Sequence, residues 1–285
     1  MRRSIRPVTL RRVIEVASLA VKDRKIDQNM IVNALNTTER RAREILFELQ
    51  RMRALETLEA FYLATPITEA IIKAYETEDW KQFHKILYEN YEFYNVFVNS
   101  ILENALTKDE ILAKLSDHTW LIFNKTAIDT LCGWAERLGQ VQRNLYNNRY
   151  YRLREEHLEL DLFMAVMERC YQNLNIELRP GLKLVYVEIA HLREDVCEKL
   201  GISRDVFDDL FIAMFRKFVG KIELCGAPLT TSAKHSPSSI RMMKKGEEHP
   251  ILSPTFMTTR EGKGVELDGK LYHYIAIFEF LKGGE

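Results

Sequence analysis

The sequence lacks the features that mark several large classes of protein. Nowhere do about eighteen apolar residues follow one another, so no membrane span is expected. The segment from Met1 to Pro7 is charged and has no apolar middle, which argues against a secretory signal. The four cysteines, Cys132, Cys170, Cys197 and Cys225, stand far apart without a CxxC pair. We therefore expect small buried thiols, no metal site and a cytoplasmic protein.

Catalytic motifs are missing as well. The chain contains no P-loop, no GxSxG turn and no HExxH pair, and its seven histidines show no metal-ligand spacing. Glu261-Gly-Lys263 resembles the end of a PD-(D/E)xK nuclease site. However, no aspartate lies between Asp209 and Asp268 to act as the metal-binding partner upstream. The sequence thus predicts a protein that is not an enzyme and carries no cofactor.

Charge is spread unevenly along the 285 residues, although the formal net charge is zero. Residues 1–53 hold 13 Lys and Arg against 6 Asp and Glu, a net charge of +7. Residues 54–160 have a net charge of −6 and residues 161–285 of −1. Since positive charge is concentrated near the N-terminus, that part of the chain is the one suited to an anionic partner. The length suffices for two or three domains.

Three helices are expected in this basic part, over Thr9–Val21, over Asp27–Leu35 and from about Asn36–Thr38 to Met52. In the third helix, apolar residues recur at helical spacing and predict a buried face made of Ala42, Ile45, Leu46, Leu49 and Met52. The residues expected to point away from the core are Arg40, Arg43, Phe47 and Arg51. Asn36 with Glu39 resembles a capping box and Thr38 is an equally good cap, so the first residue of the helix stays open.

The segment after Met52 predicts two short strands within Leu55–Leu63, and Thr65-Pro66 begins a further helix. Three helices, two short strands and a helix resemble a winged-helix domain, the helix-turn-helix variant with a β-hairpin wing. In that family the third helix enters the major groove of DNA. The resemblance implies DNA contacts along this helix from Thr38, Arg40, Arg41, Arg43 and Arg51. Alternatively, these arginines pair with Glu44 and Glu48 on a solvated helix face.

Residues 77–106 are expected to connect two such domains through a long helix from Glu78 to Leu102. This helix carries aromatic and aliphatic residues on more than one side, so something must cover it. The cover is either the rest of the chain or a second copy, because helix-turn-helix proteins commonly bind paired half-sites as dimers.

The pattern begins again in residues 107–160. A capping box at Thr107 and Glu110 opens a helix, a second helix spans Asn124–Leu138, and Gln140–Leu153 reads as a hairpin around an Asn-Asn turn. The resemblance to a recognition helix and wing implies DNA contacts from Lys125, Arg143, Arg149 and Arg152. Equally, Tyr150 and Leu153 could be core strand residues with solvated neighbours.

Residues 161–285 repeat the order once more. Helices are expected over Asp161–Asn173, His191–Leu200 and Ser203–Phe218, and strands over Leu184–Ile189, Lys221–Cys225 and Leu271–Phe278. Acidic residues at the start of the expected reading helix, Asp205, Asp208 and Asp209, would repel phosphate, which favours protein contact. A long insertion, 226–269, contains a basic cluster that could clamp nucleic acid, made of Lys234, Arg241, Lys244 and Lys245.

Together these patterns predict a mainly α protein with short β-hairpins, of the α+β class. Its tandem winged-helix domains, joined by long helices, would span residues 1–76, 107–160 and 161–285. The predicted function is binding of double-stranded DNA in the manner of a transcriptional regulator. The alternative is an adaptor subunit of a larger DNA-processing or defence complex, which binds proteins as well as DNA. A winged-helix fold alone does not decide between them.

Overall fold

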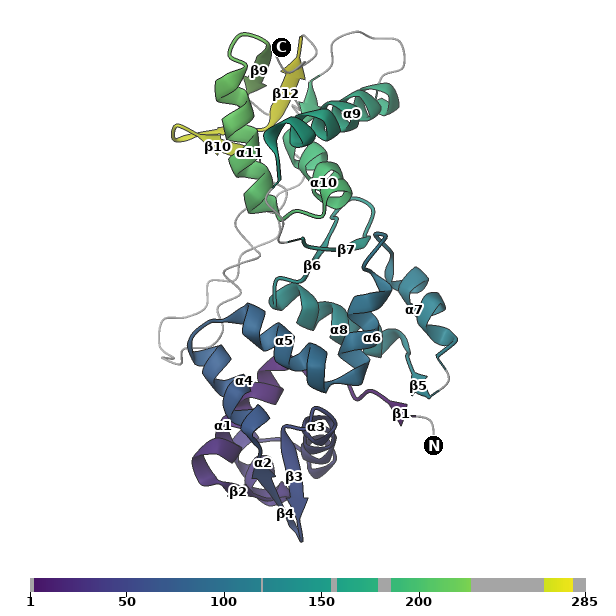
Figure 1. Cartoon of the computed structure of the whole chain (residues 1–285), viewed down its shortest axis with the longest axis vertical. Coiled ribbons are helices and arrows are strands. Elements are labelled where there is room, and N and C mark those ends of the chain that lie inside the picture. The colour runs from purple at the N-terminus through teal and green to yellow at the C-terminus, as the bar shows by residue number, and fades with distance from the viewer. Residues whose placement is uncertain (1–2, 119, 155–157, 179–185, 227–263, 279–285) are drawn as a thin grey trace. The chain divides into compact units, whose positions relative to one another are not determined.

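The computed structural model of the chain is predominantly helical, with five small sheets of two or three strands among its described residues (Figure 1). The structure describes residues 3–118, 120–154, 158–178, 186–226 and 264–278. The chain divides into two compact units, residues 1–154 and 155–285, which are described separately. The mixture of helices and small, mostly antiparallel sheets agrees with the α+β class expected from the sequence.

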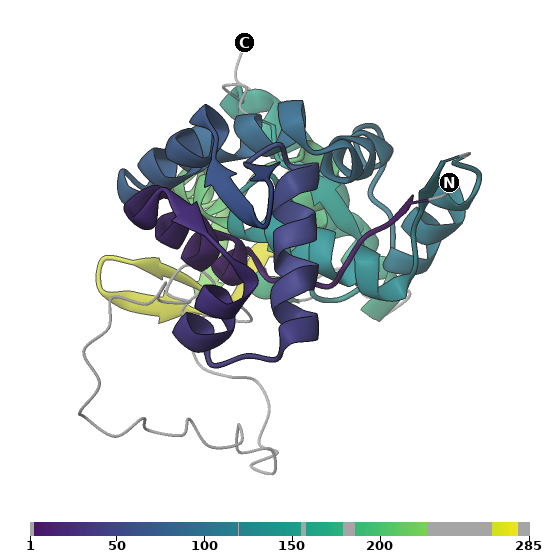
Figure 2. The same ribbon diagram turned by 90° about the horizontal axis from the view of Figure 1, so that it is seen from below.

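The first part of unit 1 is a helical cluster with a three-stranded antiparallel sheet. Its elements are α1 (Leu10–Asp23), β2 (Lys25–Ile26), α2 (Gln28–Leu35), α3 (Glu39–Arg51), β3 (Leu55–Leu58), β4 (Phe61–Ala64) and α4 (Pro66–Glu76). The last strand, β4, lies between β2 and β3 and pairs with both. Figure 2 looks onto the end of unit 1 where α3 and the β3–β4 hairpin lie side by side.

Capping residues determine where these helices begin and end. Thr38 is the N-cap of α3, because its hydroxyl accepts the N–H of Arg41 at 3.3 Å. Asn36 instead ends α2 in the left-handed conformation, with a φ of 44°. Pro66 opens α4 behind a capping box formed by Thr65 and Thr68. The open question about the start of α3 is therefore resolved in favour of Thr38.

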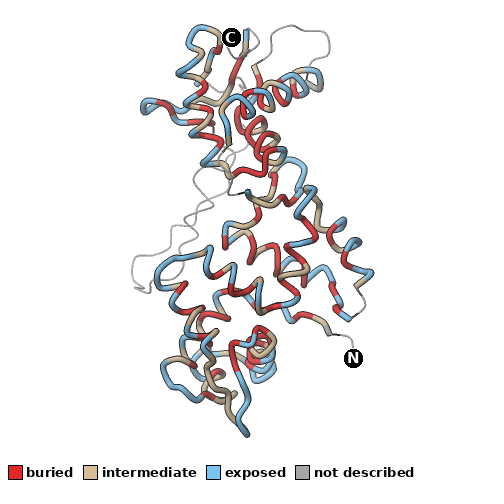
Figure 3. Tube along the Cα trace, in the orientation of Figure 1, coloured by how far each residue is buried: buried red, intermediate tan, exposed pale blue. Residues whose placement is uncertain are grey.

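The apolar periodicity of the sequence predicts the core of this part correctly. All five residues expected on the inner face of α3 are buried, namely Ala42, Ile45, Leu46, Leu49 and Met52. They lie opposite the buried face of α1, which carries Val13, Val16, Ala17 and Ala20. The exposed outer side of α3 is visible as pale blue segments in Figure 3.

The second part of unit 1 contains four helices and a hairpin. Its elements are α5 (Trp80–Asn90), α6 (Glu92–Ser100), α7 (Lys108–Ser116), β5 (Leu121–Ile122), α8 (Lys125–Arg137), β6 (Val141–Arg143) and β7 (Tyr150–Arg152). A short N-terminal strand, β1 (Arg3–Ser4), pairs in parallel with β5. The capping box at Thr107 and Glu110 and the hairpin around Asn147-Asn148 are present as predicted.

The prediction of one long helix over Glu78–Leu102 is wrong. The chain is extended at Tyr91, with φ −125° and ψ 100°, and this separates α5 from α6. Most aromatic residues of the two helices are buried, among them Phe83, Tyr94 and Phe97, while Trp80 and Tyr88 are partly exposed. The need for a second copy to cover them therefore disappears.

One order of elements recurs in the second part of unit 1. Leu106, between α6 and α7, exchanges two backbone hydrogen bonds with Tyr150 of β7, at 2.9 and 2.7 Å. The last strand, β7, thus lies between Leu106 and β6, just as β4 lies between β2 and β3. Helix, strand position, helix, helix and a returning hairpin follow one another in both parts.

Unit 2 repeats this order a third time among the described residues. Its elements are α9 (Leu160–Leu178), β8 (Val187–Glu188), α10 (Ile189–Leu200), α11 (Arg204–Lys217), β9 (Ile222–Cys225), β10 (Val265–Leu267), β11 (Lys270–Tyr272) and β12 (Tyr274–Ile277). β12 pairs antiparallel with both β8 and β9. The single strand predicted over Leu271–Phe278 is two strands, because β11 pairs with β10 in a separate hairpin.

None of the helices in the described ranges combines the length and apolar composition that a bilayer span requires. The four cysteines carry free thiols, and Cys132, Cys170 and Cys197 are buried, as expected, while Cys225 is partly exposed. Burial raises the pKa of Cys132 to about 12, so this thiol stays protonated at neutral pH.

A buried carboxylate joins the N-terminal segment, α3 and the break between α5 and α6. Glu48 on α3 is fully buried, and its Oε1 accepts the backbone N–H of Arg6 at 2.8 Å. Its other oxygen accepts the hydroxyl of Tyr91 at 2.6 Å. The Arg51 guanidinium lies 3.1 Å from Oε1 and also donates to the carbonyl of Ser4 at 2.6 Å. A buried charge is tolerated because these donors satisfy it.

Removal of the Glu48 carboxylate should strongly destabilise unit 1. Glu48→Ala leaves a buried hydroxyl, an N–H and a guanidinium without their acceptor, so the free energy of unfolding should fall by about 3–5 kcal/mol. Tyr91→Phe removes one hydrogen bond to a charged group and should lower it by about 1–3 kcal/mol. Urea denaturation measures both. Glu44→Ala, which breaks only pairs with Arg40 and Arg41 nearer the surface, is the matched control. An equal loss in the control would contradict the assignment.

The same carboxyl should give unit 1 a distinctive pH dependence. Burial raises the pKa of Glu48 above its ordinary value of 4.5, although Tyr91 and Arg51 act in the opposite direction. The folded state therefore binds this proton more tightly than the unfolded state. The stability of the natural protein relative to Glu48→Gln should be highest below about pH 4.5 and should fall as the pH rises through the raised pKa. Urea denaturation of both proteins across this range tests the sign, and a relative stability that increases with pH would contradict it.

Candidate nucleic-acid interface

The outward face of α3 carries two exposed arginines and an exposed phenylalanine. At about 100° per residue, Arg40, Arg43 and Phe47 fall within an arc of about 60° on the side opposite the buried face. We call these three residues the α3 outer stripe. Glu39 is also exposed in the first turn, where a carboxylate stabilises the positive end of the helix dipole.

The arginines of the outer stripe remain accessible to an anion. The side chain of Arg40 is 84% exposed, and its contact with Glu44 is long, at 3.4 Å. Arg43 is exposed, and no described carboxylate lies within ion-pair distance of its guanidinium. Thr38, the N-cap, is exposed beside them. Because exposed ion pairs contribute little, the Glu44 contact does not prevent Arg40 from reaching a phosphate.

Arg41 points to the flank of α3. Its guanidinium pairs with Glu44 at 2.9 Å and donates to the carbonyl of Pro7. It therefore helps to hold the N-terminal segment against α3 and is only partly available to a ligand.

The expectation that Arg51 points away from the core is wrong. Its side chain is only 15% exposed, because Glu48 and the Ser4 carbonyl draw it inward. The guanidinium also stacks on the rings of Phe47 and Phe93, at 4.1 and 5.4 Å from their centroids. We assign Arg51 a structural role and leave it out of the candidate interface.

The hairpin β3–β4 beside α3 is acidic. Glu56 and Glu59 are exposed on it, whereas its basic neighbour Lys25 lies over the ring of Phe61 at 3.7 Å. Gln50 of α3 donates to Thr57 and so ties the helix to the hairpin. The hairpin thus places two carboxylates near the cations of α3.

Two of the four basic residues expected to bind DNA in the second part of unit 1 lie beside carboxylates. Lys125 is highly exposed but lies 3.4 Å from Asp109, and Arg149 lies 3.5 Å from Glu110. The backbone N–H of Thr107 lowers the pKa of Glu110, so this carboxyl stays ionised beside Arg149. These carboxylates lower the local positive charge, but the pairs are exposed and, like the contact of Arg40 with Glu44, do not hold the cations away from an anion.

The β6–β7 hairpin is an organised turn with a buried side. Asn144 is buried, and its side chain accepts the N–H of Tyr146 at 2.9 Å. Tyr150 and Tyr151 are buried strand residues, while Arg143 and Arg152 are partly exposed. Of the two interpretations left open for Tyr150, the core residue is the one observed.

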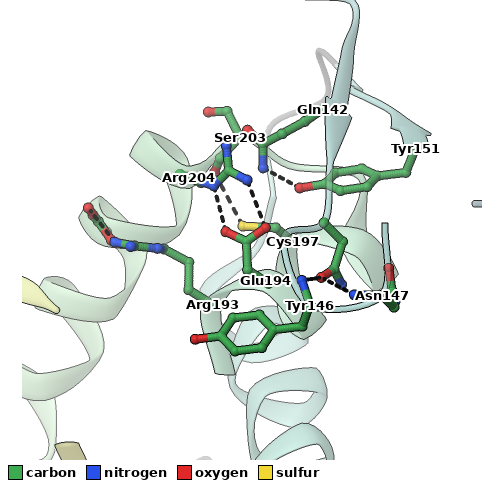
Figure 4. A network of polar contacts seen from close by, with 11 residues as sticks. Gln142, Tyr146, Asn147, Tyr151, Arg193, Glu194, Cys197, Ser203 and Arg204 are labelled. Atoms are coloured by element: carbon green, nitrogen blue, oxygen red, sulfur yellow. Dashed lines mark hydrogen bonds and ion pairs between the residues drawn. The ribbon is translucent and has the colours of Figure 1, made fainter. Parts of the chain in front are cut away.

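Unit 2 uses its charges to join α10 to α11. Arg204, the first residue of α11, donates to both oxygens of Glu194 at 2.5 and 2.8 Å (Figure 4). The fully buried Arg193 pairs with Asp208 of α11 at 3.0 Å. The exposed side of the α11 N-terminus presents Asp205 and Asp209. The basic cluster expected in the insertion lies outside the described residues, namely Lys234, Arg241, Lys244 and Lys245.

Equivalent positions in the three repeats show why α3 stands apart. Counted from the N-caps Thr38, Asn124 and Ser203, the second helical position is Arg40 in α3, Thr126 in α8 and Asp205 in α11. The fifth position is occupied by Arg43, Asp129 and Asp208. Only α3 presents cations at both positions.

Comparisons with known proteins leave these features of the chain as the basis for assigning a function. Neither a protein-family model nor a curated protein matches the sequence.

Proposed function

We propose that this protein binds double-stranded DNA through the α3 outer stripe, as a tandem winged-helix protein with a regulator-like role. The observation that carries the proposal is the pair Arg40 and Arg43, exposed on the first two turns of a helix whose opposite face is buried. Guanidinium groups at the N-terminal end of such a helix suit the phosphates and base edges of a major groove.

The fold supports the proposal through its order of elements. Helix, strand, helix, helix and returning hairpin, with the last strand in the centre of the sheet, is the arrangement expected of a winged helix. Since α3 occupies the place of the third helix, its outer stripe is where that family reads DNA. The net charge of +7 in residues 1–53 adds long-range attraction for a polyanion.

Unit 2 favours the second candidate function, that of an adaptor in a larger DNA-processing or defence complex. The N-terminal turns of α11 expose Asp205 and Asp209 next to Val206, which is 41% exposed. Carboxylates at this position repel phosphate but can meet a basic protein surface. In this version unit 1 contacts DNA and unit 2 contacts a protein partner.

Charge reversal on the outer stripe should abolish DNA binding. Arg40→Glu/Arg43→Glu replaces two contacts to an anion by repulsion, so affinity for a short duplex at low salt should fall by about 100-fold or more. The slope of log affinity against log salt concentration should become shallower by about 1 unit for each arginine that contacts a phosphate. Fluorescence anisotropy with random and genomic duplexes across a salt series measures both effects.

The matched control is Lys73→Glu/Lys85→Glu, which makes the same change in net charge at exposed positions on α4 and α5. Its affinity should stay within about 3-fold of the natural protein at moderate salt, where distant charges are screened. Equal losses in the two double variants would remove α3 from the interface. If the natural protein binds neither duplex set at low salt, the proposal is wrong.

The acidic hairpin beside α3 should weaken this binding. Glu56→Gln/Glu59→Gln removes two negative charges near the proposed path of the phosphate backbone without changing the size of the side chains. Affinity at low salt should therefore rise by about 3- to 10-fold, and the gain should vanish at high salt. The same anisotropy series tests this expectation. An affinity that does not change at low salt would mean that the hairpin lies beyond the range of the phosphate charge.

A further inference from the structure

One member of the α3 outer stripe has no role in phosphate binding. Phe47 is 42% exposed, whereas the other phenylalanines of unit 1 are buried or partly buried. We propose that Phe47 is a specificity-determining residue that contacts the 5-methyl group of a thymine in the major groove, about two base-pair steps from a guanine read by Arg43. The inference rests on the proposed function and adds a base preference to it.

The ring of Phe47 is held in place before any ligand binds. The guanidinium of Arg51 covers one ring face, with 4.1 Å between its central carbon and the ring centroid. Arg51 is in turn fixed by Glu48 and by the Ser4 carbonyl. An aromatic ring fixed in this way loses little conformational entropy when a partner covers its remaining surface.

The spacing along α3 suits neighbouring base pairs. At about 1.5 Å per residue, Arg43 and Phe47 are separated by about 6 Å along the helix axis, close to two base-pair steps of about 3.4 Å. Arginine pairs with the two acceptors of guanine, and phenylalanine makes apolar contact with the thymine methyl group. Arg40, nearer the N-terminus and highly exposed, is then placed for a phosphate.

The geometry favours DNA over a purely electrostatic partner. Exposed arginines alone would bind any polyanion, but an ordered apolar ring on the same face gains nothing from phosphate. The thymine methyl group is the apolar group on the major-groove edges of the bases, so it is the partner that Phe47 can use.

The test begins with a duplex site selected by the natural protein from a random library. Each thymine of that site is then replaced in turn by deoxyuridine, which removes only the 5-methyl group. One replacement should weaken binding by about 4-fold, the effect expected for uncovering one buried methyl group. That position should lie within about three base pairs of the guanine whose preference is lost in Arg43→Ala.

The matched variants assign the effect to Phe47. Phe47→Ala should bind the thymine and deoxyuridine duplexes equally, while Phe47→Leu, which keeps an apolar side chain, should retain part of the difference. Since Phe47 is exposed, both variants should unfold at temperatures close to that of the natural protein. If Phe47→Ala unfolds at a lower temperature, the comparison of the natural protein with Phe47→Leu in the deoxyuridine series tests the role of Phe47 instead.

Three results would overturn the inference while leaving DNA binding intact. They are a selection that yields no preferred sequence, no sensitivity to deoxyuridine at any position, and an undiminished deoxyuridine effect in Phe47→Ala. Failure of the natural protein to bind any duplex would overturn the proposed function together with the inference. The two failures are thus distinguishable.

Discussion

The buried carboxylate of Glu48 is the interaction on which the arrangement of unit 1 depends. It accepts hydrogen bonds from Arg6 and Tyr91 and pairs with Arg51, so three segments far apart in the sequence meet at one side chain of α3. A buried charge of this kind is stable only while all its partners are in place. Together with the buried apolar face of α3, it fixes the rotation of the helix about its own axis, so that Arg40, Arg43 and Phe47 face outward. The candidate interface thus follows from contacts that other sides of the helix make within unit 1.

The sequence predicts the parts of the fold that local patterns control. Apolar spacing identifies the buried face of α3, and the caps at Thr65 and Thr107 identify helix starts correctly. Contacts between distant residues escape this reasoning. In the sequence, Glu48 and Arg51 resemble an ordinary surface pair at i, i+3. Nothing near them indicates that Glu48 also binds Tyr91, which is 43 residues away. For the same reason the break at Tyr91 is missed, since the apolar pattern continues across it.

The candidate site is predictable from the sequence as a basic helix, but not residue by residue. Arg40 and Arg43 are exposed as expected. In contrast, the guanidinium of Arg51 is bound by Glu48 and the Ser4 carbonyl, and that of Arg41 by Glu44 and the Pro7 carbonyl. Lys125 and Arg149 meet carboxylates on α7. A count of charges gives the sign of a region. The count does not show which of those charges are paired, because the pairs form between residues that only the fold brings together.

The three repeats share an order of elements but differ in the residues that could contact a ligand. α3, α8 and α11 occupy the same place in their repeats, yet they differ at the second and fifth positions after the N-cap. These positions hold two arginines in α3, threonine and aspartate in α8, and two aspartates in α11. Each helix N-terminus attracts an anion through its backbone, so Asp205 in the first turn of α11 stabilises that helix while it repels phosphate. Arg40, in the first turn of α3, is placed where the helix dipole disfavours a cation. An exposed cation at a position that does not favour the helix supports the proposal that α3 binds an anionic ligand, which we propose to be DNA.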